Sequence, residues 1–149
     1  MGGLFFLNFP TMPKGTSQEK RIRIVNGKPV FFKKGSVASA EYQFRIALKP
    51  HIPETPSDKP IKLTIWFCFD TKKKKLWKKP KPTRPDTDNF LKLFKDCMTA
   101  DKNGKNGFWL DDAQVVDERV IKTYAEKASI FVSWKEIDEI EYYFEKGCE

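Results

Sequence analysis

The chain has 149 residues, the size of one ordinary globular domain. Hydrophobic residues make up 40% of it and charged residues 32%, which excludes a disordered chain and a low-complexity filament. The formal net charge is +8. A chain of this length buries enough surface to form its own core, so we expect a single domain over residues 1–149.

The excess positive charge is concentrated in residues 71–85. Eight of the 28 basic residues lie in this segment, and no acidic residue does. The remaining 20 basic residues equal the 20 acidic residues in number, so the rest of the chain is neutral. The basic and aromatic residues of the segment are Lys72, Lys73, Lys74, Lys75, Trp77, Lys78, Lys79, Lys81 and Arg84. Three prolines interrupt them and predict an exposed, irregular loop.

Cysteine spacing and hydropathy indicate the compartment. Cys68, Cys97 and Cys148 form no CxxC or Cys/His pattern, so the sequence indicates neither a disulfide framework nor a zinc site. No apolar run approaches the roughly 18 residues of a membrane helix, and the N-terminus lacks the features of a signal peptide. We expect a cytoplasmic protein without a membrane partner.

The first third of the chain has mainly strand patterns. Residues 4–9 predict one strand. Residues 21–25 and 29–32 are rich in β-branched and aromatic side chains and flank Asn26-Gly27, the strongest short-range signal for a β-hairpin.

A helix and a buried strand follow the hairpin. Residues 36–49 predict a helix that stops at Pro50. The apolar stripe expected to face the core consists of Ala38, Tyr42, Ile46 and Leu48. Residues 61–69 are β-branched and aromatic and predict a core strand.

A second helix is predicted after the basic segment, with Asp88 as its N-cap. One apolar face is formed by Phe90, Leu91, Phe94, Cys97 and Met98. Residues 101–107 are rich in glycine and asparagine and predict a turn.

The last part of the chain predicts two strands and a short helix. We expect residues 115–124 and 128–134 to pair with each other across Glu126-Lys127, and the acidic tail, residues 135–149, to contain a helix. The full order of elements predicts an α+β domain with a mixed sheet, a β-hairpin and two main helices.

Two acidic clusters stand at junctions between loops and regular elements: Asp86 with Asp88, and Asp111 with Asp112. Carboxylates brought together from two junctions form an oxygen-rich site that suits Mg²⁺. Such a site beside eight cations is chemically sensible for a polyanionic substrate, because the metal and the cations reverse the repulsion between carboxylates and phosphate.

Each of these residues also has a simpler explanation. Aspartate is common at helix N-caps and in turns, so spacing alone supports a metal-dependent phosphodiesterase only weakly. Lys92 lies one helical turn after Asp88. It either stabilises charge on a phosphate or forms an ordinary surface pair with Asp88 or Asp96.

The basic loop also has two interpretations. It is either a nucleic-acid contact or a solvated linker or import signal. Trp77 within the lysines favours nucleic acid, because an aromatic ring can stack on an unpaired base.

Several enzyme classes lack support. His51 is the only histidine, and no GxSxG or Cys/His arrangement accompanies it, which argues against triad hydrolysis. The sequence contains no P-loop and no Rossmann glycine pattern, so neither nucleotide hydrolysis nor hydride transfer is indicated.

Two motifs occur together in this chain. The first runs from Asp86 to Lys92 (DTDNFLK), and the second from Gly107 to Val116 (GFWLDDAQVV). In this order and combination they resemble the RusA family of Holliday-junction resolvases, with weaker similarity over roughly residues 10–134.

The resemblance implies a homodimeric, Mg²⁺-dependent endodeoxyribonuclease of the phage type, with Mn²⁺ as an alternative ion and no small-molecule cofactor. By the resemblance, Asp86, Asp88 and Asp112 are the metal-binding catalytic acids, and Lys92 is the essential lysine. The basic loop is the expected contact with branched DNA. The resemblance assigns no role to Asp111 or to the acidic tail.

We therefore expect paired, symmetric nicks in four-way junctions, in DNA recombination and repair. One alternative is a non-catalytic basic nucleic-acid-binding protein in which the acids are only caps and turns. The other is a nuclease with the same site that acts on flaps or forks.

Overall fold

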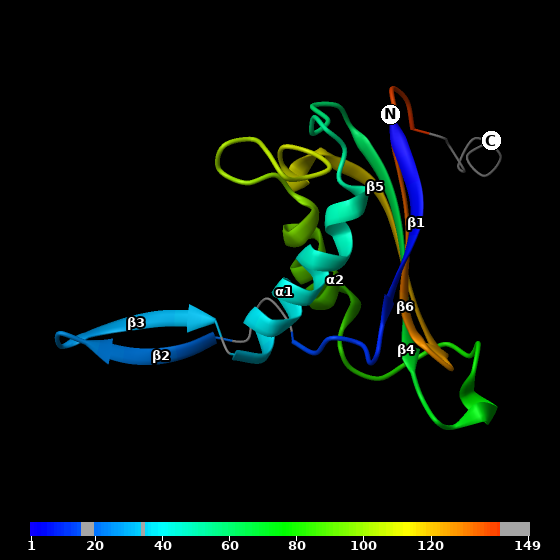
Figure 1. Ribbon diagram of the computed structural model, residues 1–149, viewed down its shortest axis with the longest axis horizontal. Coiled ribbons are helices and arrows are strands. Elements are labelled where there is room, and N and C mark those ends of the chain that lie inside the picture. Colours follow the sequence, from blue (N-terminus) through cyan, green and yellow to red (C-terminus); the bar gives the residue numbers. More distant parts are fainter. Residues whose placement is uncertain (16–19, 34, 141–149) are drawn as a thin grey trace, which may run out of the picture.

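Four strands form one mixed sheet in the order β1-β6-β4-β5. A computed structural model describes residues 1–15, 20–33 and 35–140 (Figure 1). The sheet strands are β1 (Gly2–Phe9), β4 (Ile61–Asp70), β5 (Val115–Ala125) and β6 (Ala128–Glu136). β1 and β6 are antiparallel, as are β6 and β4, whereas β4 and β5 are parallel. The expected α+β domain with a mixed sheet is confirmed.

The expected pairing of β5 with β6 is wrong, because β4 lies between them. The two-residue connection Glu126-Lys127 passes over the end of β4, whose last residue, Asp70, pairs with Ala125. Three extended residue steps reach about 10 Å, which matches two strand spacings of about 4.8 Å. This arrangement places the apolar β4 in the interior of the sheet, where both of its edges are paired.

Both long helices, α1 (Gly35–Leu48) and α2 (Thr87–Met98), cover one face of the sheet (Figure 1). The expected apolar face of α2 is confirmed, since all five of its residues are buried. In α1 the predicted stripe is confirmed at Leu48, which is buried, and wrong at its other three residues. Ala38, Tyr42 and Ile46 are exposed, Tyr42 at 67% and Ile46 at 54%, and the helix buries Val37, Ala40 and Phe44 instead.

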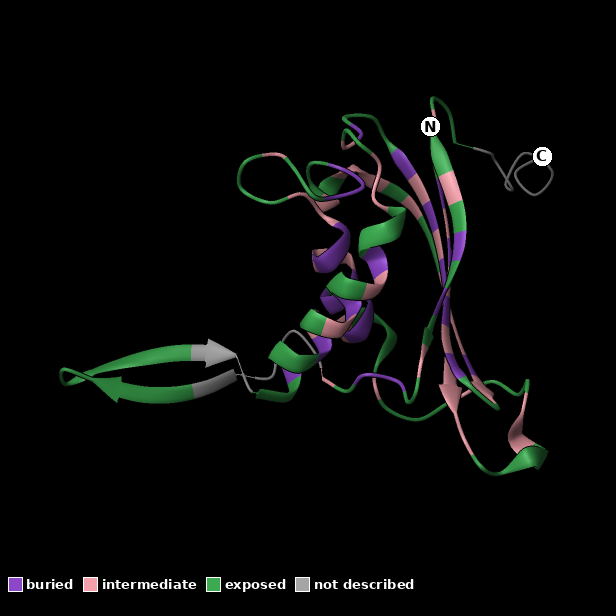
Figure 2. Ribbon diagram, viewed as in Figure 1, coloured by how far each residue is buried: buried purple, intermediate pink, exposed green. Residues whose placement is uncertain are grey.

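The core fixes which face of α1 points inward. The helix has apolar residues on two faces, and Phe44 belongs to the face that points inward. Its ring packs edge-on against Phe94, with centroids 5.1 Å apart, and against Phe90 at 5.9 Å. Figure 2 shows the buried residues gathered between the helices and the sheet.

The predicted turn over residues 101–107 is confirmed as a tight loop that follows the C-terminal end of α2. The amide of Phe108 donates to the carbonyl of Met98 at 2.7 Å, and the amide of Ala100 donates to the carbonyl of Trp109 at 2.9 Å. A Cβ at Gly107 would lie 2.3 Å from the Ala100 nitrogen, so this approach requires glycine.

The predicted hairpin is confirmed as β2 (Lys20–Val25) and β3 (Lys28–Lys33). Asn26 (φ 52°) and Gly27 (φ 75°) form its turn, with the positive φ angles typical of a type I′ turn. The hairpin extends away from the helices and the sheet (Figure 1).

The described residues also contain three short 3-10 helices: η1 (Lys49–His51), η2 (Lys74–Leu76) and η3 (Asp112–Gln114). The first two residues of the acidic tail belong to β6, residues 137–140 contain no helix, and residues 141–149 lie outside the described part of the chain. In that described part, neither long helix has the length and apolar character needed to cross a membrane.

Candidate nuclease site at the two ends of helix α2

Asp86 and Asp88 lie at the N-terminal end of α2, and both are exposed. Asp86, not the expected Asp88, is the N-cap residue, and Asp88 lies in the first helical turn. The Asp86 side chain makes no capping hydrogen bond, although its carbonyl accepts one from the Phe90 amide at 3.1 Å. Its carboxylate is therefore not used by the helix, and the helix dipole favours negative charge here.

The second acidic pair divides into a structural and an unused carboxylate. Asp111 is the N-cap of η3 and accepts a hydrogen bond from the Ala113 amide at 2.8 Å. Gln114 completes the capping box by accepting from the Asp111 amide at 2.8 Å. Among the described residues, no hydrogen bond or ion pair involves the Asp112 carboxylate. Asp111 thus has a structural task in the cap, whereas the Asp112 carboxylate is available for a ligand.

The chain places the two acidic pairs at opposite ends of α2. Ten residue steps from Asp88 to Met98 span about 15 Å of helix, and the loop that leads to Asp112 begins beyond Met98. The sheet shows the same separation. Val115 of β5 follows η3 directly, whereas Lys122 of β5 lies next to Asp86. The seven residue steps between Val115 and Lys122 span about 23 Å.

An ion pair fixes the same antiparallel relation between α2 and β5. Lys95, late in α2, lies 2.8 Å from Glu118, early in β5. Within the described part of one chain, no three His, Cys, Asp or Glu side chains lie close enough together to hold a metal ion. One copy of the chain thus brings Asp86 together with Asp88, but not with Asp112.

Lys92 lies on the exposed side of α2, one turn after Asp88. Its side chain is 58% exposed, and its Nζ lies 3.8 Å from the Asp96 carboxylate. An exposed pair at this distance contributes little to stability. The lysine can therefore exchange this partner for another anion.

Two lysines that sequence reasoning did not single out as structural hold the segment before Asp86. Lys122, on β5, donates to the carbonyls of Thr83 and Pro85, each at 2.6 Å. Lys81 donates to the hydroxyl of Thr83 and to the carbonyl of Arg84 at 2.7 Å. Together the two ammonium groups fix three consecutive residues that lead directly into Asp86.

The environment of Lys122 is partly dry. Burial lowers the pKa of its ammonium group, and the nearby positive charge of Lys81 lowers that pKa further, whereas Asp86 and Tyr124 act in the opposite direction. The signal that could have found Lys122 was its position: an isolated cation on a strand that follows the GFWLDDAQVV motif. Its contact with residues almost 40 positions away could not be foreseen from spacing.

The basic loop adds a short pairing to the end of β5. The amide of Lys78 donates to the carbonyl of Tyr124 at 2.9 Å, and the amide of Lys81 donates to the carbonyl of Lys122 at 3.1 Å. Trp77 is half-buried and donates its indole N–H to the Thr71 carbonyl at 2.9 Å. The exposed cations of the loop are Lys72, Lys73, Lys74, Lys75, Lys78, Lys79 and Arg84.

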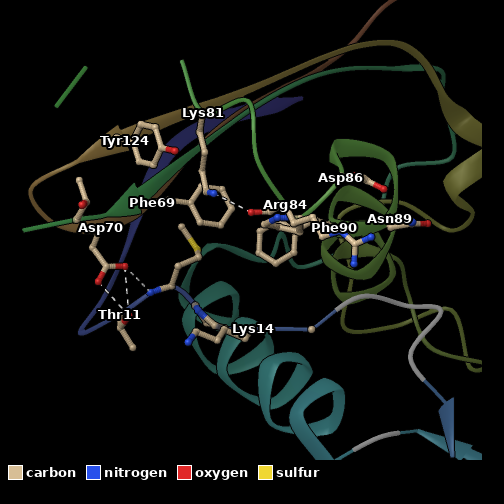
Figure 3. A pocket seen from close by; sticks show the side chains of 15 residues that line it. Thr11, Lys14, Phe69, Asp70, Lys81, Arg84, Asp86, Asn89, Phe90 and Tyr124 are labelled. Carbon is tan, nitrogen blue, oxygen red and sulfur yellow. Dashed lines mark hydrogen bonds between the residues drawn. The ribbon is translucent and has the colours of Figure 1, made fainter. Parts of the chain in front are cut away.

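An open cavity of about 810 Å³ lies beside Asp86 (Figure 3). Lys14, Lys81 and Arg84 line it, together with Asn89 of α2 and aromatic rings of β4 and β5. Figure 3 shows Lys81 beside Phe69 and Tyr124, and its Nζ lies 5.2 Å and 5.3 Å from the centroids of these two rings. The cavity thus combines cations, aromatic faces and one carboxylate of the candidate site.

Comparison with known protein families assigns the chain to the nucleases. Residues 10–134 match the family described as Endodeoxyribonuclease RusA. The chain belongs to the RusA family of endodeoxyribonucleases.

Individual relatives agree with this assignment. The chain is 32% identical over 124 residues to "Crossover junction endodeoxyribonuclease rusA" of Lactococcus phage r1t, which covers 82% of this chain and 89% of that protein. It is 54% identical over 43 residues to the proteins of the same name from Escherichia coli K12 and Enterobacteria phage 82. Those shorter matches cover 29% of this chain and 32% of each relative.

Proposed function

We propose that this chain resolves four-way DNA junctions by hydrolysing one phosphodiester bond in each of two symmetry-related strands. The observation that carries the proposal is that both family motifs stand in the chain and that the fold leaves the carboxylates of Asp86 and Asp112 unused. Relatives from phage r1t and from Escherichia coli bear the name crossover junction endodeoxyribonuclease, which supports the same substrate.

The working unit is a homodimer in which each active site takes residues from two chains. One chain holds Asp88 and Asp112 about 15 Å or more apart, because α2 separates them. A two-fold axis turns the second copy end for end, so that the α2 N-terminus of one protomer can meet η3 of its partner. The same axis produces two identical sites, which matches the two strands of a junction.

The donor set fits a hard divalent cation. Asp86, Asp88 and Asp112 would provide carboxylate oxygens, the ligand type that Mg²⁺ prefers and that Mn²⁺ also accepts. When bound, the ion supplies charge neutralisation and lowers the pKa of a water molecule. No small-molecule cofactor is needed for this chemistry.

The chain's own side chains position and neutralise the substrate. Lys92 donates to a non-bridging phosphate oxygen, for which it leaves its weak contact with Asp96. Lys81 and Lys122 keep Asp86 in place by holding the backbone in front of it. The exposed cations of the basic loop bind the DNA backbone by counterion release, so affinity falls with added salt.

A cleavage assay tests the proposal. A labelled synthetic four-way junction and a linear duplex of the same sequence are each incubated with Mg²⁺ or with EDTA. We expect paired, symmetric nicks in the junction alone, in the presence of Mg²⁺ alone. Asp88→Asn should still bind the junction but not cut it, because a neutral amide oxygen binds Mg²⁺ more weakly than the carboxylate does.

Other outcomes would assign another function. Binding without cleavage under every condition would indicate a basic nucleic-acid-binding protein. Equal cleavage of flaps, forks and junctions would keep the site but replace the substrate.

A further inference from the structure

The hairpin β2-β3 forms an arm that the rest of the described chain does not cover. Among the described strands, β2 and β3 pair only with each other. Six paired positions give the arm a length of about 20 Å, and it extends clear of the body (Figure 1). An isolated two-stranded hairpin is only marginally stable in water, so the arm gains from a surface that covers it.

One face of the arm is apolar. Ile22 pairs with Phe31, and Ile24 pairs with Pro29. Because side chains alternate along a strand and cross-strand partners share a face, these four residues lie on the same side. Ile22 is 64% exposed, Ile24 76% and Phe31 65%. Three large apolar side chains with such exposure, next to one another, are typical of a binding surface.

The charge of the arm favours DNA as the partner. Residues 20–33 contain five basic residues and no acidic residue. Arg23 and Lys28 lie on the face opposite the apolar one, by the same alternation. An arm with five positive charges and no negative charge attracts the phosphates of a nucleic acid.

The root of the arm lies beside the candidate site. Lys14 and Gly15, which precede the arm, line the same cavity as Asp86 and Asn89. DNA that is cut at Asp86 therefore passes within reach of the arm. Apolar side chains gain from DNA contact mainly when they enter between base steps, as wedges that unstack and bend the duplex.

We propose that the arm inserts its apolar face, Ile22, Ile24 and Phe31, between base pairs at the crossover of a four-way junction. This inference rests on the proposed function. Continuous stacking is already interrupted at a crossover, so opening a step there costs less than within a duplex. The opposite face, with Arg23 and Lys28, turns toward the phosphates. The arm thus selects branched DNA.

A fluorescence experiment tests the wedge. 2-Aminopurine, which brightens when it unstacks, is placed next to the crossover, and binding is measured in EDTA so that no strand is cut. The test variant is Ile24→Thr with Phe31→Thr, because threonine is polar yet keeps a high strand propensity. The matched control is Val30→Thr, one position away and on the other face of the arm.

We expect the wild-type protein and the control to raise the fluorescence, and the double variant to lose most of the rise. The double variant should also bind the junction roughly tenfold more weakly and bind linear duplex unchanged. An undiminished rise in the double variant would overturn the proposal. A shift of that variant from dimer to monomer in sedimentation would also overturn it, because the arm would then cover a second copy.

Junction cleavage and insertion of the arm can be tested separately. If the wild-type protein does not cut junctions, the proposed function fails and the wedge fails with it. If the wild-type protein cuts junctions and the double variant cuts them with the same preference over duplex, only the wedge is wrong.

Discussion

Aspartates that look alike in the sequence have different tasks in the structure. Asp111 caps η3, and Asp70 accepts hydrogen bonds from Thr11 and from the Met12 amide, each at 3.0 Å. By contrast, Asp86 stands at an N-cap position without capping, and Asp112 follows a cap without forming one. The carboxylates proposed as metal ligands are those that the fold does not need for itself.

The most informative single substitution is Lys122→Met. It removes two hydrogen bonds to the segment before Asp86 and keeps a side chain of similar length. Each bond contributes about 1 kcal/mol, so we expect junction cleavage to slow by roughly tenfold or more. Junction binding in EDTA should change little, because Lys122 is not part of the exposed basic surface.

Arg119→Met, on the same strand, is the matched control and should cut at the wild-type rate. Rates are measured at saturating Mg²⁺ and again at limiting Mg²⁺. A positioning role predicts a higher Mg²⁺ requirement in Lys122→Met and partial recovery in Lys122→Arg. A Lys122→Met protein that cuts as fast as the control would contradict the role.

At the scale of elements, the end of β6 supports the end of the molecule that carries Asp112. Glu136 accepts a hydrogen bond from the Ser57 hydroxyl at 2.6 Å, and the Ser57 carbonyl accepts from the Gln114 side chain of η3 at 2.9 Å. Glu136 also contacts the amino group of Met1 at 3.3 Å, which ties the start of β1 to the same network.

This network makes part of the stability depend on pH. The Ser57 hydrogen bond, with the N-terminal amino group and Lys59, holds the pKa of Glu136 below its ordinary value of 4.5. A lowered pKa in the folded state stabilises the protein above the unfolded pKa, and this contribution disappears as the pH falls through the folded pKa. We expect Glu136→Gln to lower the free energy of unfolding at pH 7, and to matter progressively less below pH 4.5.

Urea unfolding of both proteins at a series of pH values measures this difference. Asp58→Asn, an exposed acidic residue next to Ser57, serves as the control and should show no such trend. A constant difference between Glu136→Gln and the wild-type protein across the pH series would mean that the hydrogen bond does not depend on charge.

At the scale of the whole molecule, the residues that we propose as functional lie at both ends of α2 and on an arm outside the body. The α2 N-terminus has the cavity and the basic loop beside it, and η3 lies at the far end. In the proposed homodimer, this layout would bring opposite ends of two copies together. The basic loop and the apolar face of the β2-β3 arm both lie outside the packed core of the domain.

Local patterns were sufficient for much of the fold. Asn26-Gly27 predicted the hairpin, and the apolar spacing of residues 90–98 predicted α2, because both depend on neighbours in sequence. The pairing of β5 with β4 could not be foreseen, since a two-residue connection usually joins adjacent strands. The inward face of α1 depends on Phe90 and Phe94, which belong to another helix.

The candidate site residues could be named from the sequence, but their arrangement in space could not. Asp86, Asp88, Asp112 and Lys92 are predicted from two motifs, and their roles stay a prediction, because the spacing of the motifs carries no information on distance in space. The separation of Asp88 from Asp112 is fixed by the length of α2 and by the parallel pairing of β4 with β5. The role of Lys122 depends on the same pairing.

The most direct test of the central claim, a metal site shared between two chains, mixes two inactive variants. Asp88→Asn and Asp112→Asn are combined, exchanged into mixed dimers and assayed on a four-way junction with Mg²⁺. In a mixed dimer, a shared site leaves one active site intact and one doubly damaged. Random exchange should therefore restore about a quarter of the wild-type sites, seen as nicks in one strand at a time.

Each variant alone should be inactive, and native mass spectrometry of the mixture should confirm that mixed dimers have formed. Recovery of nicking only in the mixture is the result that the account predicts. A mixture that contains mixed dimers and stays inactive would place all three acids in one chain and contradict the account.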